Sequence, residues 1–182
     1  RYALPRKISD QYAIRRYGFH GISHQSVVKQ AASFLKTPVN KLNLITIHLG
    51  NGASISAIKK GICVDTTMGM TPLEGLVMGT RPGDLDPGIL TLLAREGWNQ
   101  EALETMLNQD SGMKGLCGTN DFREILQNKE AVNEEAKIAL ELYCYRVRKT
   151  IGSFSTVIGP VDALVFTGGV AENVPWVRER SV

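Results

Sequence analysis

The sequence predicts an α/β or α+β fold in which helices flank one mixed β-sheet. Three observations support this class. Residues 43–66 show the period-two alternation of three short strands, residues 87–153 carry mostly helical patterns, and an apolar strand at 163–166 follows the helices. The first three strands are consecutive and therefore antiparallel, whereas the last is expected to add a parallel pairing.

The composition limits the kinds of molecule that the protein is expected to bind. The 182 residues suffice for one domain, or for one and a small piece of another, and an apolar fraction of 43% with a net charge of +3 is ordinary for a globular protein. No run of Lys and Arg exceeds two residues, and no apolar run approaches the roughly 18–20 residues of a membrane span. We therefore expect neither nucleic acid nor a membrane as a partner.

The chain begins RYALPRK, with no initiator Met, no apolar signal core and no small-residue cleavage site, so we expect a fragment. Its three cysteines, Cys63, Cys117 and Cys144, are far apart and odd in number. They predict neither a disulfide framework nor a zinc site, but the reduced thiols of a cytoplasmic protein.

The first helix is predicted at 25–36, after a polar and basic stretch at 1–24. Apolar side chains recur at positions that share one helix face. Ser23 is expected as its N-cap, and Pro38 ends the helix because proline lacks an amide hydrogen.

The three strands of the meander are predicted at 43–49, 53–59 and 62–66. Asn51-Gly52, between the first two, is the strongest hairpin signal, because both residues tolerate the positive φ angles of a type I′ turn. Lys60-Gly61 turns the chain again before the third strand.

Residues 67–87 hold four Gly, three Pro and three Met, which predicts a long ordered loop of functional value. Asp86 and Pro87 then suit the N-cap and first residue of a helix at 87–96, and a second helix follows at 99–108. Residues 109–120 are glycine-rich again.

Asp121 and Glu124 have the spacing of a capping box at the start of a short helix. The longest helix is predicted at 133–153, and the strand at 163–166 has the composition of a buried strand. Gly168-Gly169 follows that strand and precedes a further helix start. This order suits the ribonuclease-H-like half of an actin-like ATPase.

His20 and Arg81 are the strongest candidates for catalysis. Transfer of a phosphoryl group to a carboxylate brings two anions together, and the oxygens of the transferring group need fixed cationic or hydrogen-bonding donors. Arg grips two oxygens with its planar fork, and His donates as the cation or as a neutral N–H. The alternatives are a structural His in a Gly-flanked loop and an Arg paired with Asp84 or Asp86.

Three further segments could bind a nucleotide. His48–Gly52 offers backbone N–H groups in a tight turn, and Gly168–Asn173 follows a strand at the end where α/β folds bind nucleotides. Phe122 or Arg123 could lie against a base, with Asp121 on a hydroxyl. The alternatives are an ordinary hairpin, a plain strand-to-helix turn, and helix capping with Phe122 in the core. No residues show the diagnostic spacing of a metal site.

Taken together, three long segments resemble the acetate kinase (acetokinase) family. They are Arg15–His24 (RRYGFHGISH), His48–Ser54 (HLGNGAS) and Asp65–Asp86, and the resemblance extends over all 182 residues. It implies a reversible in-line transfer of a phosphoryl group from ATP to acetate, with Mg²⁺. It also implies a cytoplasmic, homodimeric enzyme of the actin-like fold.

The resemblance also implies roles for the matched residues. His20 in YGFHG and Arg81 in MGTR would stabilise the transition state. The ATP-binding residues would be His48, Leu49, Gly50, Asn51, Gly52, Asp121, Phe122, Arg123, Gly169, Val170, Ala171, Glu172 and Asn173. No metal ligand is assigned to this chain, because the magnesium-binding Glu of the family is expected outside it.

The chain departs from the family in three ways. Ile22 stands where Thr is usual, which removes a hydroxyl contact, and Ala171 stands where Gly is usual, which argues against a positive φ there. Family members are about twice as long. Residues 1–182 are therefore expected to be one partial domain, most of the C-terminal nucleotide-binding domain, without the N-terminal one. A propionate or butyrate kinase, or a non-catalytic nucleotide-binding or dimerisation module, stays an alternative.

Overall fold

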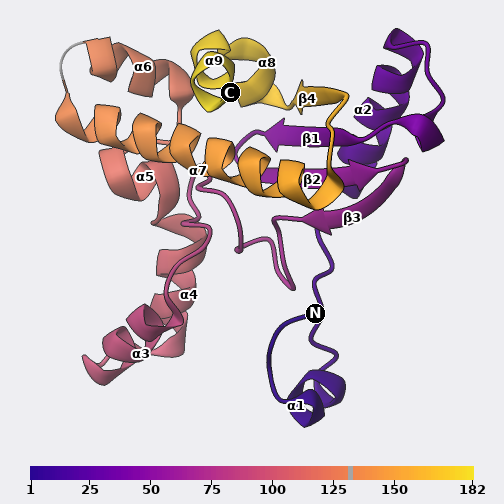
Figure 1. The fold of residues 1–182 in the computed structure, drawn as a ribbon. Coiled ribbons are helices and arrows are strands. Elements are labelled where there is room, and N and C mark those ends of the chain that lie inside the picture. The colour runs from indigo at the N-terminus through magenta and orange to yellow at the C-terminus, as the bar shows by residue number, and fades with distance from the viewer. Residues whose placement is uncertain (131–132) are drawn as a thin grey trace.

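The computed structural model, which describes residues 1–130 and 133–182, is built around a four-stranded mixed sheet (Figure 1). The strands are β1 (Leu44–Leu49), β2 (Ala53–Lys59), β3 (Ile62–Thr66) and β4 (Ala163–Thr167), in the order β3-β2-β1-β4. β1 pairs antiparallel with β2 and parallel with β4. The predicted mixed sheet is confirmed, and each predicted strand end lies within one residue of the observed one.

The helices follow the predicted order with three additions. They are α1 (Arg6–Gln11), α2 (Gly21–Phe34), α3 (Pro87–Arg95), α4 (Gln100–Gln109), α5 (Gly112–Cys117), α6 (Phe122–Glu130), α7 (Glu134–Ile158), α8 (Gly169–Asn173) and α9 (Pro175–Ser181), with a 3-10 turn at Val39–Lys41. The sequence had predicted neither α1 nor α5, and it had predicted one helix after β4 where α8 and α9 are observed. Helix α7 is longer than predicted. Within the described part of the chain, no helix has the length and apolar character needed to cross a membrane.

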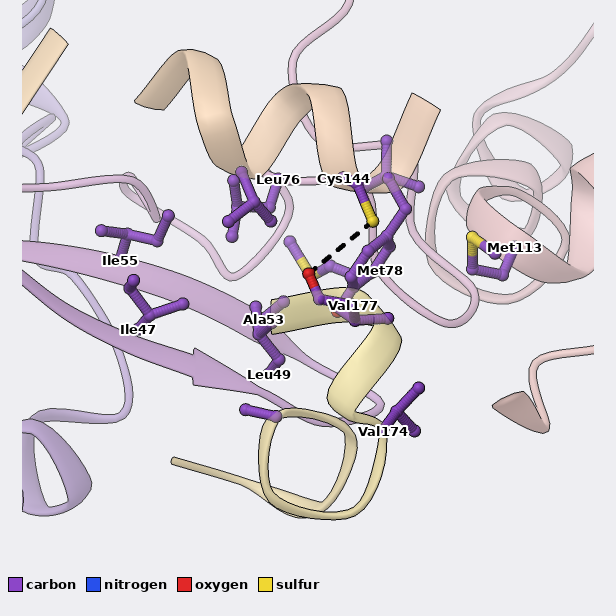
Figure 2. Packing of buried hydrophobic residues seen from close by; sticks show 14 of the residues in the cluster. Ile47, Leu49, Ala53, Ile55, Leu76, Met78, Met113, Cys144, Val174 and Val177 are labelled. Carbon is purple, nitrogen blue, oxygen red and sulfur yellow. Dashed lines mark hydrogen bonds between the residues drawn. The ribbon is translucent and has the colours of Figure 1, made fainter. Parts of the chain in front are cut away.

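The main hydrophobic core lies between one face of the sheet and α7 (Figure 2). β1 and β2 contribute every second residue to it, because successive side chains of a strand point to opposite faces. These residues are Ile45, Ile47, Leu49, Ala53, Ile55 and Ala57. Helix α7 contributes a stripe that includes Leu140, Tyr143 and Cys144. This packing fixes the register of the strands and therefore the orientation of their other face.

The opposite face of the sheet changes from apolar to polar along β1 and β2. At one end Leu44 and Ile58 pack against Val28 of α2. At the other end the same face carries buried or half-buried polar side chains, namely those of Thr46, His48, Ser54 and Ser56. We call this region the polar end of the sheet; it lies where β1 ends and α2 begins.

The turn between β1 and β2 is not of the predicted type. Leu49 pairs with Ala53, so three residues make the connection, and neither Asn51 nor Gly52 has a positive φ. The positive-φ pair expected of a type I′ turn lies instead at the β2–β3 turn, at Lys60 (50°) and Gly61 (78°). The hairpin is confirmed but its type I′ geometry is wrong, because long-range contacts rather than local propensity fix the first loop.

The capping box predicted for α6 is only half formed. Asp121 Oδ1 accepts a hydrogen bond from Arg123 N at 2.9 Å, as an N-cap does. Glu124 does not return a bond to Asp121 N. Its carboxylate accepts from Thr119 Oγ1 at 2.8 Å, and Asp121 N donates to that same hydroxyl. Thr119 therefore takes the place of the second partner in the box.

Strand β4 is half-buried along its whole length, although its composition predicted a buried strand. The reason is its place at the edge of the described sheet, where it pairs only with β1. At the far side of the molecule α3 and α4 extend away from the sheet, and neither has a buried residue (Figure 1).

Candidate active site

All three histidines of the chain meet at the polar end of the sheet. His20 precedes α2, His24 lies one helical turn later, and His48 is on β1. The rings of His20 and His48 are stacked, with centroids 4.2 Å apart, and His24 meets His48 edge-on at 6.4 Å. Sequence reasoning assigned roles to His20 and His48 but missed His24. The signal was its spacing of four residues from His20, which places both on one helix face.

The start of α2 differs from the prediction. His20, not Ser23, is the N-cap residue, and its backbone lies in the left-handed region with φ 60° and ψ 23°. Ser23 is already inside the helix, and its hydroxyl shares a hydrogen bond with His48 Nδ1 at 2.9 Å. The hydroxyl therefore orients a site residue instead of capping the helix.

Buried hydrogen bonds connect two of the histidines. His20 Nδ1 lies 2.9 Å from Ser54 Oγ, and His24 Nε2 lies 2.8 Å from the same oxygen. The other ring nitrogen of His24 lies 2.8 Å from Thr46 Oγ1. These bonds fix the orientation of both rings.

The three rings are held in their neutral form. Burial lowers the pKa of His20 to about 4, with additional repulsion from His48 and Arg81. Burial also lowers the pKa of His24 to about 4, again with contributions from the neighbouring histidines. The pKa of His48 is lowered by burial and partly restored by Glu172. Near neutral pH the site therefore contains three imidazoles and one fixed cation, Arg81.

Arg81 and His20 converge on the backbone of Gly52. A Cβ atom at Gly52 would lie 2.7 Å from Arg81 Nη2 and 3.2 Å from His20 Nε2, so only glycine allows this close approach. Arg81 Nη1 donates to Pro72 O at 2.6 Å. The two residues predicted to stabilise a transition state are therefore brought together beside Gly52.

The alternative role for Arg81, an ion pair with a nearby aspartate, is not observed. Among the described residues no carboxylate oxygen lies within 4.0 Å of its guanidinium. Asp84 lies 3.6 Å from Arg146, and Asp86 caps α3 by accepting from Gly88 N. Arg81 is left with positive charge available to an anion.

Helix α5 holds the loop that carries Arg81. Its amides at Met113 and Lys114 donate to the carbonyls of Met78 and Gly79, each at 2.9 Å. The helix can come this close because it begins at Gly112, whose φ is 61° and whose absent Cβ would lie 2.2 Å from Met78 O. The N-terminal amides of α5 therefore bind protein and position Arg81.

The β1–β2 loop presents backbone amides beside these side chains. Gly50 N donates to Gly52 O at 3.0 Å, while the amides of Asn51 and Gly52 have no acceptor among the described residues. Asn51 is held by Gly79 N at its carbonyl and by Asn120 Nδ2 at its side chain, each at 2.9 Å. The second bond brings the start of α6 beside the loop.

The Asp121–Arg123 segment divides between core and surface. Phe122 is buried and meets Tyr143 edge-on, with ring centroids 5.0 Å apart, so its ring cannot stack on a base. Arg123 is exposed and Asp121 is half-buried, and the two bind each other; hydrogen bonds from Arg123 lower the pKa of Asp121 to about 2. Of the three side chains in this segment, only those of Asp121 and Arg123 can therefore contact a nucleoside.

The segment after β4 lies beside the end of β1. Glu172 accepts from Gly168 N, and Asn173 Nδ2 donates to Gly169 O. Val170 packs on the main core and Leu49 is fully buried in it, so both can reach a ligand only through their backbones.

Two departures from the family pattern can be judged from the structure. Ala171 is fully buried in α8 and has no positive φ, so the backbone there does not require glycine. Ile22 is 89% exposed in α2, so its own side chain packs little against the rest of the protein. Within 1–130 and 133–182, no group of three or more His, Cys, Asp or Glu side chains could hold a metal ion.

Comparisons with known proteins find relatives over nearly the whole chain. The model of the Acetokinase family matches residues 1–182. An acetate kinase of Sulfurovum sp. (strain NBC37-1) is 54% identical over 180 residues, 98% of this chain and 46% of that protein. One of Syntrophobacter fumaroxidans is 53% identical over 98% of this chain and 44% of its own length. The chain thus spans about half the length of the curated relatives that it matches.

Solved structures agree with the fold. The acetate kinase of Porphyromonas gingivalis matches all of this chain and 46% of its own, with a TM-score of 0.97 and 46% identity. A propionate kinase of Francisella tularensis matches equally fully, with a TM-score of 0.96 and 44% identity. The expected class, a ribonuclease-H-like half of the actin-like ATPase fold, is confirmed.

Proposed function

The chain belongs to the acetokinase family, and on that premise we propose that it forms one wall of an active site that transfers a phosphoryl group between ATP and acetate. The observation that carries the proposal is the convergence of His20 Nε2 and Arg81 Nη2 on Gly52. A planar cation and an imidazole that face one point suit the oxygens of a transferring phosphoryl group.

In the proposed reaction, an oxygen of the acetate carboxylate attacks the terminal phosphorus of ATP as the bond to the ADP oxygen breaks. The guanidinium of Arg81 offsets the repulsion between the two anions and holds the phosphoryl oxygens. Neutral His20 donates a hydrogen bond to the same group. Because both residues are fixed by protein contacts, they need little reorganisation when charge moves.

ATP binding is proposed to use the other matched segments. The free amides of Asn51 and Gly52 suit the phosphates, and the start of α8 lies at the same end of the sheet. The surface ion pair of Asp121 and Arg123 suits the adenosine, since Arg can stack on a base and Asp can bind a hydroxyl.

Several wider properties stay proposals. Mg²⁺ would accompany ATP and neutralise its phosphates, but the described residues do not gather a set of ligands for it. As the family resemblance implies, its ligands are proposed to lie in a part of the enzyme outside this chain. We also propose that this chain is most of the nucleotide-binding domain of a two-domain enzyme. The enzyme is proposed to be a homodimer and to be cytoplasmic.

The acyl chain of the substrate is a separate question. The chain matches the acetate kinase of P. gingivalis and the propionate kinase of F. tularensis almost equally well, so the fold does not distinguish their substrates. Competition among acetate, propionate and butyrate, measured as the acyl phosphate formed, separates these alternatives. The assay needs a protein that has the relatives' full length and carries this sequence. We call this protein the complete enzyme.

Replacing Arg81 with Ala tests the proposal. In the complete enzyme, kcat should fall by about 10³-fold or more, with only a modest change in the KM for ATP, because the lost contact acts in the transition state. Arg95→Ala, at the exposed end of α3, is the matched control and should leave both constants unchanged. A near-normal kcat for Arg81→Ala would refute the assigned role. The 182-residue chain alone should form no acyl phosphate.

A further inference from the structure

A chain of hydrogen bonds connects the protein interior to His20. It passes from Thr46 Oγ1 to His24 Nδ1 (2.8 Å), from His24 Nε2 to Ser54 Oγ (2.8 Å) and from Ser54 Oγ to His20 Nδ1 (2.9 Å). Thr46 and Ser54 are fully buried and His24 is 5% exposed. Water is therefore not a ready substitute partner, and the hydrogens must be arranged within the chain itself.

The hydroxyl of Ser54 couples the two rings. It has one hydrogen and lies between two ring nitrogens, so it donates to one and accepts from the other. If Ser54 donates to His24, the Nδ1 of neutral His20 must carry the proton and its Nε2 is bare. If Ser54 donates to His20, His24 Nε2 must carry a proton and neutral His20 carries its own on Nε2.

The hydroxyl of Thr46 decides between these two arrangements. In the first, His24 Nδ1 donates to Thr46, whose own hydrogen is left with Ser56 O at 3.5 Å, beyond the usual range for an O–H donor. In the second, Thr46 donates to His24 Nδ1 at 2.8 Å, and the hydrogens of Thr46, His24 Nε2 and Ser54 all lie in short bonds. A buried hydroxyl without a good acceptor is unfavourable, so the second arrangement is preferred.

The second arrangement is also the one that the chemistry needs. His20 Nε2 faces Gly52 and Arg81, where the transferring group is proposed to lie. Because the lowered pKa keeps this ring neutral near pH 7, it has a single N–H, which must be on Nε2 to reach a phosphoryl oxygen.

We propose that His24, acting through Ser54, is a positioning residue that places the proton of His20 on Nε2, so that the neutral ring donates to the transferring phosphoryl group. The inference rests on the proposed function, and it adds two residues, His24 and Ser54, that do not touch the substrate themselves. Thr46 anchors the far end and sets the direction of the chain.

Nitrogen NMR of the complete enzyme, labelled with ¹⁵N at histidine, tests the proton arrangement without any assay of activity. The spectrum of a His20→Gln variant assigns the His20 signals. Near pH 7 we expect a protonated Nε2 and a bare Nδ1, and a mixture of both tautomers in Ser54→Ala. A protonated Nδ1 in the unchanged enzyme would overturn the proposal.

Kinetics test the consequence for turnover. Ser54→Ala should lower kcat on the order of 10²-fold, with the KM for ATP changed less than about threefold, because a transition-state donor is misplaced. Ser56→Ala is the matched control, because it makes the same change on the same strand and the same face. Ser56 is 3% exposed, and its hydroxyl bonds Thr66 and no histidine. Its kcat should stay within about threefold.

A pair of His24 variants separates positioning from folding. His24→Gln keeps an amide that can donate to Ser54, whereas His24→Leu removes it, and the thermal midpoints of both are measured. We expect His24→Gln to retain at least about tenfold more kcat than His24→Leu. Equal kcat values for His24→Gln and His24→Leu, or for Ser54→Ala and Ser56→Ala, would overturn the positioning role of His24 and Ser54. They would leave the proposed function intact. If the unchanged enzyme forms no acyl phosphate, the proposed function fails, and NMR alone then tests whether the His20 proton lies on Nε2.

Discussion

A methyl group added at Gly52 should disable catalysis without unfolding the protein. The Cβ of Gly52→Ala would lie 2.7 Å from Arg81 Nη2 and 3.2 Å from His20 Nε2, where ordinary contact begins at 3.4 Å. Arg81 must therefore retreat by 3.4 − 2.7, about 0.7 Å, and His20 by 3.4 − 3.2, about 0.2 Å. The two groups would no longer face one point.

The expected effect follows from the size of this displacement. Misplacement of a reacting group by about 1 Å costs on the order of 10²-fold in rate, so we expect kcat to fall by about 10- to 10²-fold. Stability should change by less than about 1 kcal/mol, because Gly52 has no positive φ and Arg81 ends in a flexible group that can move.

The assay is steady-state formation of acyl phosphate by the complete enzyme, with thermal unfolding measured in parallel. Gly21→Ala is the control: it adjoins His20, has no positive φ, and its Cβ would meet nothing within 4 Å. Gly50→Ala, whose Cβ would lie 3.5 Å from Gly52 O, should have a much smaller effect. A Gly52→Ala enzyme with the kcat of Gly21→Ala would refute the convergence of Arg81 and His20 on this glycine.

Three other outcomes are expected. The folded-state pKa of His24, about 4, lies below its unfolded value of 6.5, so its contribution is complete above pH 6.5 and is lost as the pH falls toward 4. His20 has a similar pKa and adds its own loss, so the part due to His24 is the difference between the unchanged protein and His24→Gln, on the order of 2 kcal/mol by about pH 4.5 in urea titrations; an equally steep loss in His24→Gln would contradict this. Phe122→Ala should destabilise by about 3–5 kcal/mol, since it removes a ring packed on Tyr143; a change below about 1 kcal/mol would count against this packing. Arg123→Ala should leave the thermal midpoint nearly unchanged yet raise the KM for ATP, and an unchanged KM would exclude it from the nucleotide site.

The sheet could be predicted from the sequence because its signals are local. Ile45, Ile47 and Leu49 alternate with Thr46 and His48, and this period of two also determines which residues share a face. The polar end of the sheet was therefore implicit in the pattern. The pattern also predicted the helix that became α2, but it could not show that this helix packs against the polar end of the sheet and brings His24 to Ser54.

The errors have long-range causes. Asn51 has the propensity for a type I′ turn but is bound by Gly79 and Asn120, so tertiary contacts determine its backbone. Helix α5 begins at a left-handed glycine, Gly112, and its amides bind the carbonyls of a loop more than thirty residues earlier. Local sequence patterns contain no information about such contacts.

The backbone conformation of His20 lowers the stability of the fold. A residue other than glycine in the left-handed region, here with φ 60°, is disfavoured by about 1–2 kcal/mol, and asparagine tolerates that region best. His20→Asn should therefore melt at a higher temperature than the parent while its turnover falls, and a lower midpoint would contradict this. Selection for phosphoryl transfer has, on this view, kept a conformation that selection for stability alone would have removed.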